Sequence, residues 1–197
     1  MTVLKSLKVV AIPGAMGAAA WAAKHLADWG AQVTLLEPPE GTPLRKEPPF
    51  YQVDGERRSA MWAWLSRGVT VVRSGQDLPT TPAKARRACS HANVVLIDAA
   101  MAEPVLGITP SELRGSFEGR TNCVLISPFS SDGPYANYQA TDLGVNSLGG
   151  WTGMIGEPDR EPLRPGGDMN ARVSGVYAFD AALIALHHER RGAAPAF

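Results

Sequence analysis

The chain has 197 residues, of which 45% are hydrophobic and 19% are charged, and its 19 basic and 19 acidic residues cancel. This length suits one α/β domain with a sizeable core, and the hydrophobic content at zero net charge excludes an intrinsically disordered chain. A protein that binds a phosphate backbone needs a basic excess, so we expect no nucleic-acid partner. The sequence predicts a single domain over residues 1–197.

The cysteines Cys89 and Cys123 belong to no Cys-x-x-Cys pair and no Cys/His cluster. This predicts reduced thiols, no metal site and a cytoplasmic location. The first residues do not have the pattern of a signal peptide. The most apolar stretch, residues 11–23, is interrupted by Pro13 and glycines and is too short to cross a bilayer, so no membrane association is expected.

The first half of the chain begins with a strand–helix–strand pattern. Residues 9–12 predict a buried strand, residues 15–29 an alanine-rich helix capped by Gly30, and residues 32–36 a second buried strand. Short joints between such elements imply a parallel pair of strands with a right-handed crossover. Residues 38–56 are dense in proline and glycine, and we expect no regular element there.

The rest of the chain continues to alternate strands with helices. The sequence predicts strands over residues 69–72, 94–97 and 123–126, helices over 61–65, 82–90, 142–151 and 169–190, and loops over 127–138 and 152–167. Thr109 to Glu112 has the composition of a helix start. The fold class is therefore α/β, doubly wound, with a mainly parallel Rossmann-like sheet, flanking helices and a long final helix.

A glycine-bearing turn follows the first predicted strand. Gly14 and Gly17 open the first helix, and Glu37 ends the second strand 20 residues later. In a dinucleotide fold such glycines admit a pyrophosphate at the helix N-terminus, and the acid binds a ribose. The alternative is a tight strand–helix turn packed with small residues. An NAD(P)-binding Rossmann protein is therefore one hypothesis.

Asp168 follows Gly166 and Gly167 and precedes the long final helix. A carboxylate at this position can accept backbone N–H groups and is stabilised by the positive end of the helix, which favours the ionised, nucleophilic form. The alternative is an ordinary helix cap. The four histidines form no recognisable catalytic triad with a serine or cysteine.

Three segments carry a further pattern. They run from Leu26-Ala27-Asp28-Trp29-Gly30 to Pro43-Leu44-Arg45, from Ile126-Ser127-Pro128-Phe129 through Gly133-Pro134-Tyr135 to Thr141-Asp142-Leu143, and from Gly156-Glu157-Pro158-Asp159 through Arg164-Pro165-Gly166 and Asp168 to Glu189-Arg190. Together, in order and spacing, these segments resemble the family III CoA-transferases, also called the CaiB/BaiF family.

The resemblance implies a specific chemistry. It makes Asp168 the nucleophile that attacks an acyl-CoA thioester, forms a mixed anhydride, and then carries CoA as an aspartyl-CoA thioester until an acceptor carboxylic acid takes it. It places the turn near the thioester and implies no metal. The residues that it assigns to CoA binding are Ala15, Met16, Gly17, Arg45, Arg67 and Tyr135.

The chain also departs from the family pattern. Val69 stands where the family has a lysine, and Ile97-Asp98-Ala99-Ala100-Met101-Ala102 stands where the family has Glu-Asn-Phe-Arg-Pro-Gly. These departures favour the alternative of a non-catalytic scaffold or interface domain. Thr141 stands where the related racemases have a histidine, so racemase activity is not expected. Family members are about twice as long and dimeric, so we expect an incomplete chain that pairs with a second copy or a partner subunit.

Overall fold

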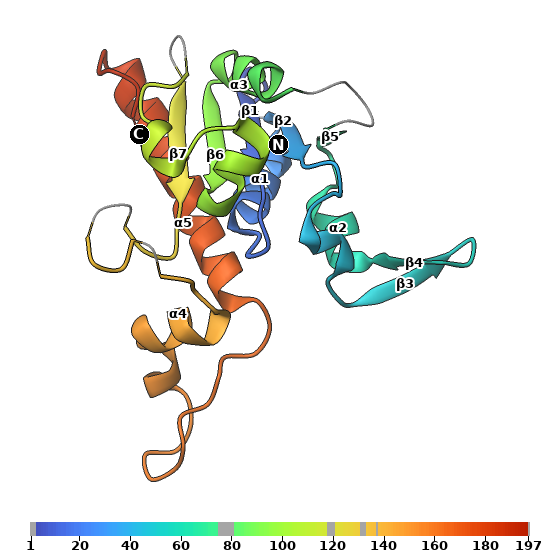
Figure 1. Cartoon of the computed structure of the whole chain (residues 1–197), viewed down its shortest axis with the longest axis vertical. Helices are drawn as coiled ribbons and strands as arrows, with labels where there is room; N and C mark the ends of the chain where they lie inside the picture. The colour runs from blue at the N-terminus through green and yellow to red at the C-terminus, as the bar shows by residue number, and fades with distance from the viewer. Residues whose placement is uncertain (1–2, 75–80, 118–120, 131–132, 137, 197) are drawn as a thin grey trace.

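The computed structural model describes residues 3–74, 81–117, 121–130, 133–136 and 138–196 (Figure 1). Within these residues a five-stranded sheet has the order β5-β2-β1-β6-β7, and every pair of neighbours is parallel. The strands are β1 (Lys8–Ile12), β2 (Gln32–Glu37), β5 (Thr70–Arg73), β6 (Val94–Asp98) and β7 (Asn122–Ile126). The predicted doubly wound α/β fold is confirmed.

Helices cover both faces of the sheet (Figure 1). The α-helices are α1 (Ala18–Asp28), α2 (Ala60–Leu65), α3 (Pro82–Ser90), α4 (Asp142–Leu148) and α5 (Met169–Arg190). Short 3-10 or π turns are η1 (Pro43–Lys46), η2 (Ala99–Met101), η3 (Ala102–Leu106), η4 (Pro110–Glu112) and η5 (Trp151–Met154). One core cluster lies between the sheet, α1 and α5, and a second lies between the sheet, α3 and η3.

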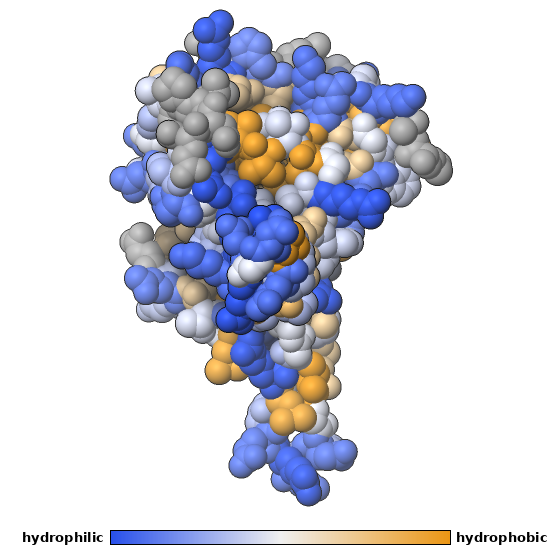
Figure 2. All heavy atoms as spheres, turned by 90° about the vertical axis from the view of Figure 1, so that its right-hand side faces the viewer, coloured by the Kyte–Doolittle hydropathy of each residue, from blue (hydrophilic) through white to orange (hydrophobic). Residues whose placement is uncertain are grey.

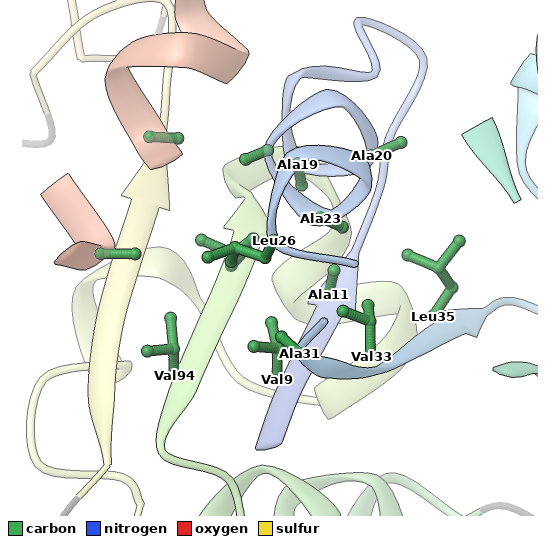
Figure 3. Close-up of a cluster of buried hydrophobic side chains, with 14 of the residues drawn as sticks. Val9, Ala11, Ala19, Ala20, Ala23, Leu26, Ala31, Val33, Leu35 and Val94 are labelled. Atoms are coloured by element: carbon green, nitrogen blue, oxygen red, sulfur yellow. The ribbon is translucent and has the colours of Figure 1, made fainter. Parts of the chain in front are cut away.

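The first core cluster depends on small side chains. Figure 3 shows Ala19 and Ala23 of α1 on the side of the helix that faces the strands carrying Val9, Ala11 and Val33. Ala19 and Ala20 are fully buried, so the helix backbone lies close to the sheet while each side chain loses almost no rotamer entropy. The short side chains thereby place the N-terminus of α1 close to the carboxyl ends of the central strands.

The strand order reverses between β1 and β6. Ile12 at the end of β1 is in register with Ile97 of β6, and the next residue of β6 is Asp98. The chain leaves β1 toward one face of the sheet and β6 toward the other, which opens a crevice beyond the carboxyl ends of these strands. The Gly14–Gly17 turn begins here.

Three sequence predictions need correction. The first helix starts at Ala18 instead of residue 15, because residues 14–17 form a turn with Gly17 at φ 72°. Residues 38–56 contain regular structure, since β3 (Phe50–Val53) pairs antiparallel with β4 (Glu56–Ser59). The predicted helix start at Thr109 makes its capping box but continues only as the single turn η4. Of the predicted loop over 127–138, positions 131, 132 and 137 lie outside the described residues.

Both cysteines are free thiols in the second core cluster. Burial raises the pKa of each of them to about 12, so Cys89 and Cys123 are protonated and unreactive at neutral pH. Among the described residues, no helix is long and apolar enough to cross a membrane.

Large apolar side chains are nevertheless exposed on two helices and on the loop beyond α4. Tyr177 is 71% and Ile184 is 59% exposed on α5, and Leu148 is 73% exposed on α4. Figure 2 shows apolar surface on the narrow lower part of the molecule, where Figure 1 places α4 and the loop after it. A single copy of this chain therefore leaves apolar surface of the kind that marks a contact with another chain.

Candidate active site

A cavity of about 170 Å³ lies beyond the carboxyl ends of β1 and β2. Its lining joins segments that are far apart in the sequence: Ala15, Met16, Trp21, Leu44, Glu47, Met61, Asp142, Arg164, Asp168 and Ala171. Ala15, Met16 and Asp168, which were predicted separately from the turn and from the start of the last helix, thus line one cavity.

Asp168 stands directly before α5, after Gly167 at φ 69°. Its backbone oxygen accepts the N–H of Arg172 at 3.1 Å, but its side chain makes no capping hydrogen bond. The prediction that this carboxylate accepts backbone N–H groups is therefore wrong. Its φ of −95° and ψ of 56° depart from the extended conformation that turns a cap side chain back onto the helix. Within the part of the chain that the structure describes, this carboxylate has no hydrogen-bond partner, and it stands at the positive end of a 22-residue helix.

Asp142, the first residue of α4, ties together the segments on either side of Asp168. Its Oδ1 accepts the amide of Asn170 at 2.9 Å, and its Oδ2 accepts Arg164 Nε at 3.1 Å. The amide of the fully buried Asn146 also donates to Asp142 Oδ2, at 3.1 Å. Arg164 precedes Asp168 and Asn170 follows it, so this network fixes the backbone that carries Asp168. Sequence reasoning missed this network, because the contacts join residues up to 28 positions apart.

The turn before α1 is closed by a hydrogen bond from Gly17 N–H to the oxygen of Gly14 at 3.1 Å. A Cβ on Gly17 would lie 2.9 Å from a methyl of Leu44, and its φ of 72° is one that other residues rarely adopt. Gly17 is therefore buried behind Leu44 instead of lining the cavity. Ala15 and Met16, in contrast, line the cavity.

Asp98, at the end of β6, lies under this turn. Its Oδ2 accepts Gly14 N–H at 2.7 Å, its Oδ1 accepts Ala19 N–H at 3.1 Å, and the residue is 6% exposed. A carboxylate of the protein thus occupies the position at the α1 N-terminus where a dinucleotide fold binds pyrophosphate. This contact disfavours the NAD(P) hypothesis. The sequence signal for the contact is an acid at the end of β6, the strand that pairs with β1.

The carboxylate of Glu37 also binds partners within the protein. Its carboxylate accepts Arg45 Nε at 3.0 Å and Arg45 Nη2 at 2.8 Å, and Arg73 Nε lies 3.6 Å away. The side chain of Glu37 has no exposed surface, whereas the two guanidinium groups are partly exposed. Glu37 is therefore not placed to bind a ribose. Arg45, predicted to bind CoA, is held by Glu37 and stacks over the ring of Trp62 at 4.9 Å.

Glu37→Gln is expected to lower the free energy of unfolding by about 2–3 kcal/mol, because it removes the buried negative charge that Arg45 and Arg73 both face. Urea unfolding at pH 7 measures this loss. The exposed neighbour Glu40 provides the matched control, and Glu40→Gln should change stability by less than about 0.5 kcal/mol. Equal effects of the two substitutions would contradict the importance of this ion-pair cluster.

Burial raises the pKa of Asp98 from its ordinary 3.8 to about 6, and the backbone N–H groups of Gly14, Ala19 and Gly17 only partly oppose this. The folded chain thus binds this proton more tightly than the unfolded chain. The resulting stability is fully present below pH 3.8 and is lost as the pH rises through about 6.

We expect the stability of the wild type, relative to Asp98→Asn, to fall by up to about 3 kcal/mol between pH 4 and pH 7. Urea unfolding of both proteins across this range gives the difference at each pH, and all other carboxyl groups cancel in it. A difference that is constant, or that increases with pH, would contradict the raised pKa.

Like Gly17 and Arg45, the two remaining predicted binding residues lie outside the cavity lining. Arg67 is exposed after α2, and Tyr135 is 55% exposed. Tyr135 packs edge-to-face on Tyr138, with ring centroids 5.2 Å apart, and contacts Phe129 with centroids 6.0 Å apart. The structure does not bring either residue together with Asp168 in this cavity.

The fold and the site define an α/β protein with a cavity at the carboxyl ends of parallel strands, and Asp168, whose side chain makes no capping hydrogen bond, is part of its lining. The chain belongs to CoA-transferase family III, whose family model matches residues 4–194. Over 195 residues it is 30% identical to a succinate–glutarate CoA-transferase of Agrobacterium fabrum. This match covers 95% of this chain and 48% of the relative.

Two further relatives support the assignment. A succinyl-CoA–D-citramalate CoA-transferase of Chloroflexus aurantiacus is 30% identical over 90% of this chain and 44% of its own length. A crystal structure of a CaiB/BaiF family protein from Brucella suis superposes with a TM-score of 0.82 at 30% identity, over 97% of this chain and 51% of that one. The chain thus spans about half the length of the curated relatives that it matches.

Proposed function

We propose that this chain transfers CoA between an acyl-CoA and a carboxylic acid, with Asp168 as the nucleophile. The observation that carries the proposal is the position of Asp168: its carboxylate makes no capping bond and lies in the lining of the same cavity as Ala15 and Met16. The cavity is smaller than the roughly 300–1,000 Å³ of sites that enclose a whole ligand. It therefore suits the acyl end of the substrate, with the rest of CoA lying outside it.

The reaction needs only the groups present in this cavity and the two substrates. An oxygen of Asp168 attacks the thioester carbonyl carbon, the C–S bond breaks, and CoA leaves as a thiolate. The thiolate then attacks the Asp168 carbonyl carbon of the mixed anhydride, which releases the donor acid as a carboxylate and leaves an aspartyl-CoA thioester. The acceptor carboxylate repeats both steps in reverse, which restores the Asp168 carboxylate without a net proton transfer.

Backbone donors are available for the negative charge that develops on the thioester oxygen. The N–H groups of Ala15 and Met16 have no hydrogen-bond partner among the described residues, and both residues line the cavity. Such fixed donors stabilise an oxyanion without reorganisation during the reaction. Gly17 supports this turn from behind. Arg45 and Arg67 are the proposed contacts to the CoA phosphates, and Tyr135 is a proposed contact farther out.

The substrate class that we propose is the dicarboxylic acids and their CoA thioesters. The matched transferases are named for succinate, glutarate and citramalate, which all carry two carboxyl groups. We also propose that a second copy of the chain, or a partner subunit, covers the exposed apolar side chains of α4 and α5, such as Leu148 and Tyr177.

The test is a transfer assay with the purified chain, using succinyl-CoA as donor and glutarate as acceptor. We expect glutaryl-CoA to accumulate, and mass spectrometry separates it from the donor thioester. If neither glutaryl-CoA nor any other dicarboxyl-CoA is formed over a panel of acceptors, the proposal fails. If calorimetry also detects no CoA binding, the departures from the family pattern at Val69 and over residues 97–102 favour a scaffold domain.

A further inference from the structure

Asp98 is a buried acid that the proposed chemistry does not use. It lies 84 positions along the chain from Gly14, yet it accepts the Gly14 N–H at 2.7 Å and, with its second oxygen, the Ala19 N–H at 3.1 Å. One carboxylate therefore holds both ends of the segment that contains Ala15 and Met16. These two residues are the part of the segment that lines the cavity.

Few other polar contacts hold this segment in place. Within the turn, Gly17 N–H bonds to the oxygen of Gly14 at 3.1 Å. Outside it, Thr42 Oγ1 donates to the oxygen of Pro13 at 3.5 Å, a long and weak hydrogen bond. Asp98 therefore anchors both ends of this turn to β6, through hydrogen bonds that are shorter than the contact from Thr42.

The turn also rests directly on the side chain of Asp98. A Cβ added to Gly14 would lie 3.3 Å from Asp98 Cβ and 3.1 Å from Met101 Cγ. On its other side, Gly17 is covered by Leu44, where an added Cβ would lie 2.9 Å from a methyl carbon. The turn is thus confined between Leu44 and Asp98, and a smaller residue at 98 would remove both the anchor and the support.

We propose that Asp98 is a positioning residue of the reaction, which holds Ala15 and Met16 in the wall of the cavity that Asp168 also lines. This inference rests on the proposed CoA transfer. A shift of about 1 Å at a group remote from the chemistry can cost roughly 100-fold in rate, because the reacting atoms leave their aligned geometry. Asp98 contacts no substrate in this mechanism and acts only through the turn.

The test compares Asp98→Ala and Asp98→Asn with Glu103→Gln, which removes an exposed acid five positions away. Two quantities are measured on folded protein: the rate at which Asp168 is acylated at saturating succinyl-CoA, and the calorimetric Kd for CoA. We expect Asp98→Ala to slow acylation by about 10- to 100-fold with less than a threefold change in Kd. Asp98→Asn, which retains one acceptor, should lie between Asp98→Ala and the wild type.

Amide hydrogen exchange makes the inference independent of activity. In both Asp98 variants the hydrogen-bonded amides of Gly14, Gly17 and Ala19 should exchange at least about tenfold faster than in the wild type, while those at the C-terminal end of α1 stay protected. Acylation at the wild-type rate in either folded variant, or unchanged exchange of the Gly14, Gly17 and Ala19 amides, overturns the role of Asp98. Failure of the wild type itself to form an adduct overturns the proposed function, and exchange then still decides whether Asp98 holds the turn. Asp98→Asn keeps the test decisive if Asp98→Ala does not fold.

Discussion

Asp168→Asn is expected to abolish the acyl adduct at this position and to lower CoA transfer by at least about 1,000-fold. The asparagine amide has nearly the same shape as the carboxylate but is not a nucleophile and cannot form the mixed anhydride. The Asp168 side chain makes no capping bond, so the substitution removes no structural hydrogen bond of that side chain. The loss should therefore appear in the rate and not in the stability. The transfer assay and a thermal melt measure the two separately.

The matched control is Asp159→Asn, an exposed acid in the loop that leads to Asp168. It should leave the transfer rate within about twofold of the wild type. Folded Asp168→Asn that retained more than a tenth of the wild-type rate would exclude Asp168 as the nucleophile. Another acid of the cavity, Glu47 or Asp142, would then be the group to examine.

Gly175→Val is expected to lower the free energy of unfolding by about 3–5 kcal/mol, or to prevent folding. Gly175 lies where α5 crosses α1, and a Cβ there would be 2.4 Å from Trp21 Cβ and 3.2 Å from the backbone oxygen of Ala18. Both atoms belong to the helix backbone or its first side-chain carbon, so no rotamer change relieves the overlap. The two helices would have to separate.

The control for Gly175→Val is Gly153→Val. Gly153 has no atom within 4 Å of an added Cβ and no positive φ, so its substitution should cost less than about 1 kcal/mol. Urea unfolding of both variants measures the difference. Gly175 lies seven residues after Asp168, about 10 Å along α5, so a surviving Gly175→Val protein should also lose transfer activity. Equal stability of the two variants would contradict the close helix packing.

The alternating strands and helices were predictable because buried β-branched runs and an alanine-rich helix carry strong local signals. The strands around Val9, Val33 and Val95 appear where their patterns place them. The β3–β4 hairpin was not predicted, because the many prolines and glycines of residues 38–56 argued against regular structure and outweighed the turn signal of Asp54 and Gly55. Asp54 and Gly55 both have positive φ and form the two-residue turn that an Asp-Gly pair favours between strands.

The site was predictable only where one residue carries its own signal. Asp168 stands out after two glycines and before a long helix, and the turn at Ala15 and Met16 stands out after a strand. Asp142 acts through contacts with residues distant in the chain, and no local pattern reports such contacts. For Asp98, the signal is only that an acid ends the strand beside β1. Arg45 shows the same limit, because its pairing with Glu37 depends on how η1 folds back onto the end of β2.

The most direct measurement identifies the residue whose carboxyl group is activated, as a mixed anhydride or as a CoA thioester, during the reaction. The chain is incubated with succinyl-CoA and then with hydroxylamine, which converts an activated carboxyl group to a hydroxamate, and the modified peptide is identified by mass spectrometry. We predict one hydroxamate, on Asp168, that is absent from Asp168→Asn and present in Asp159→Asn. A hydroxamate on another residue, or none under conditions in which CoA binds, would contradict the assignment of Asp168 as the nucleophile.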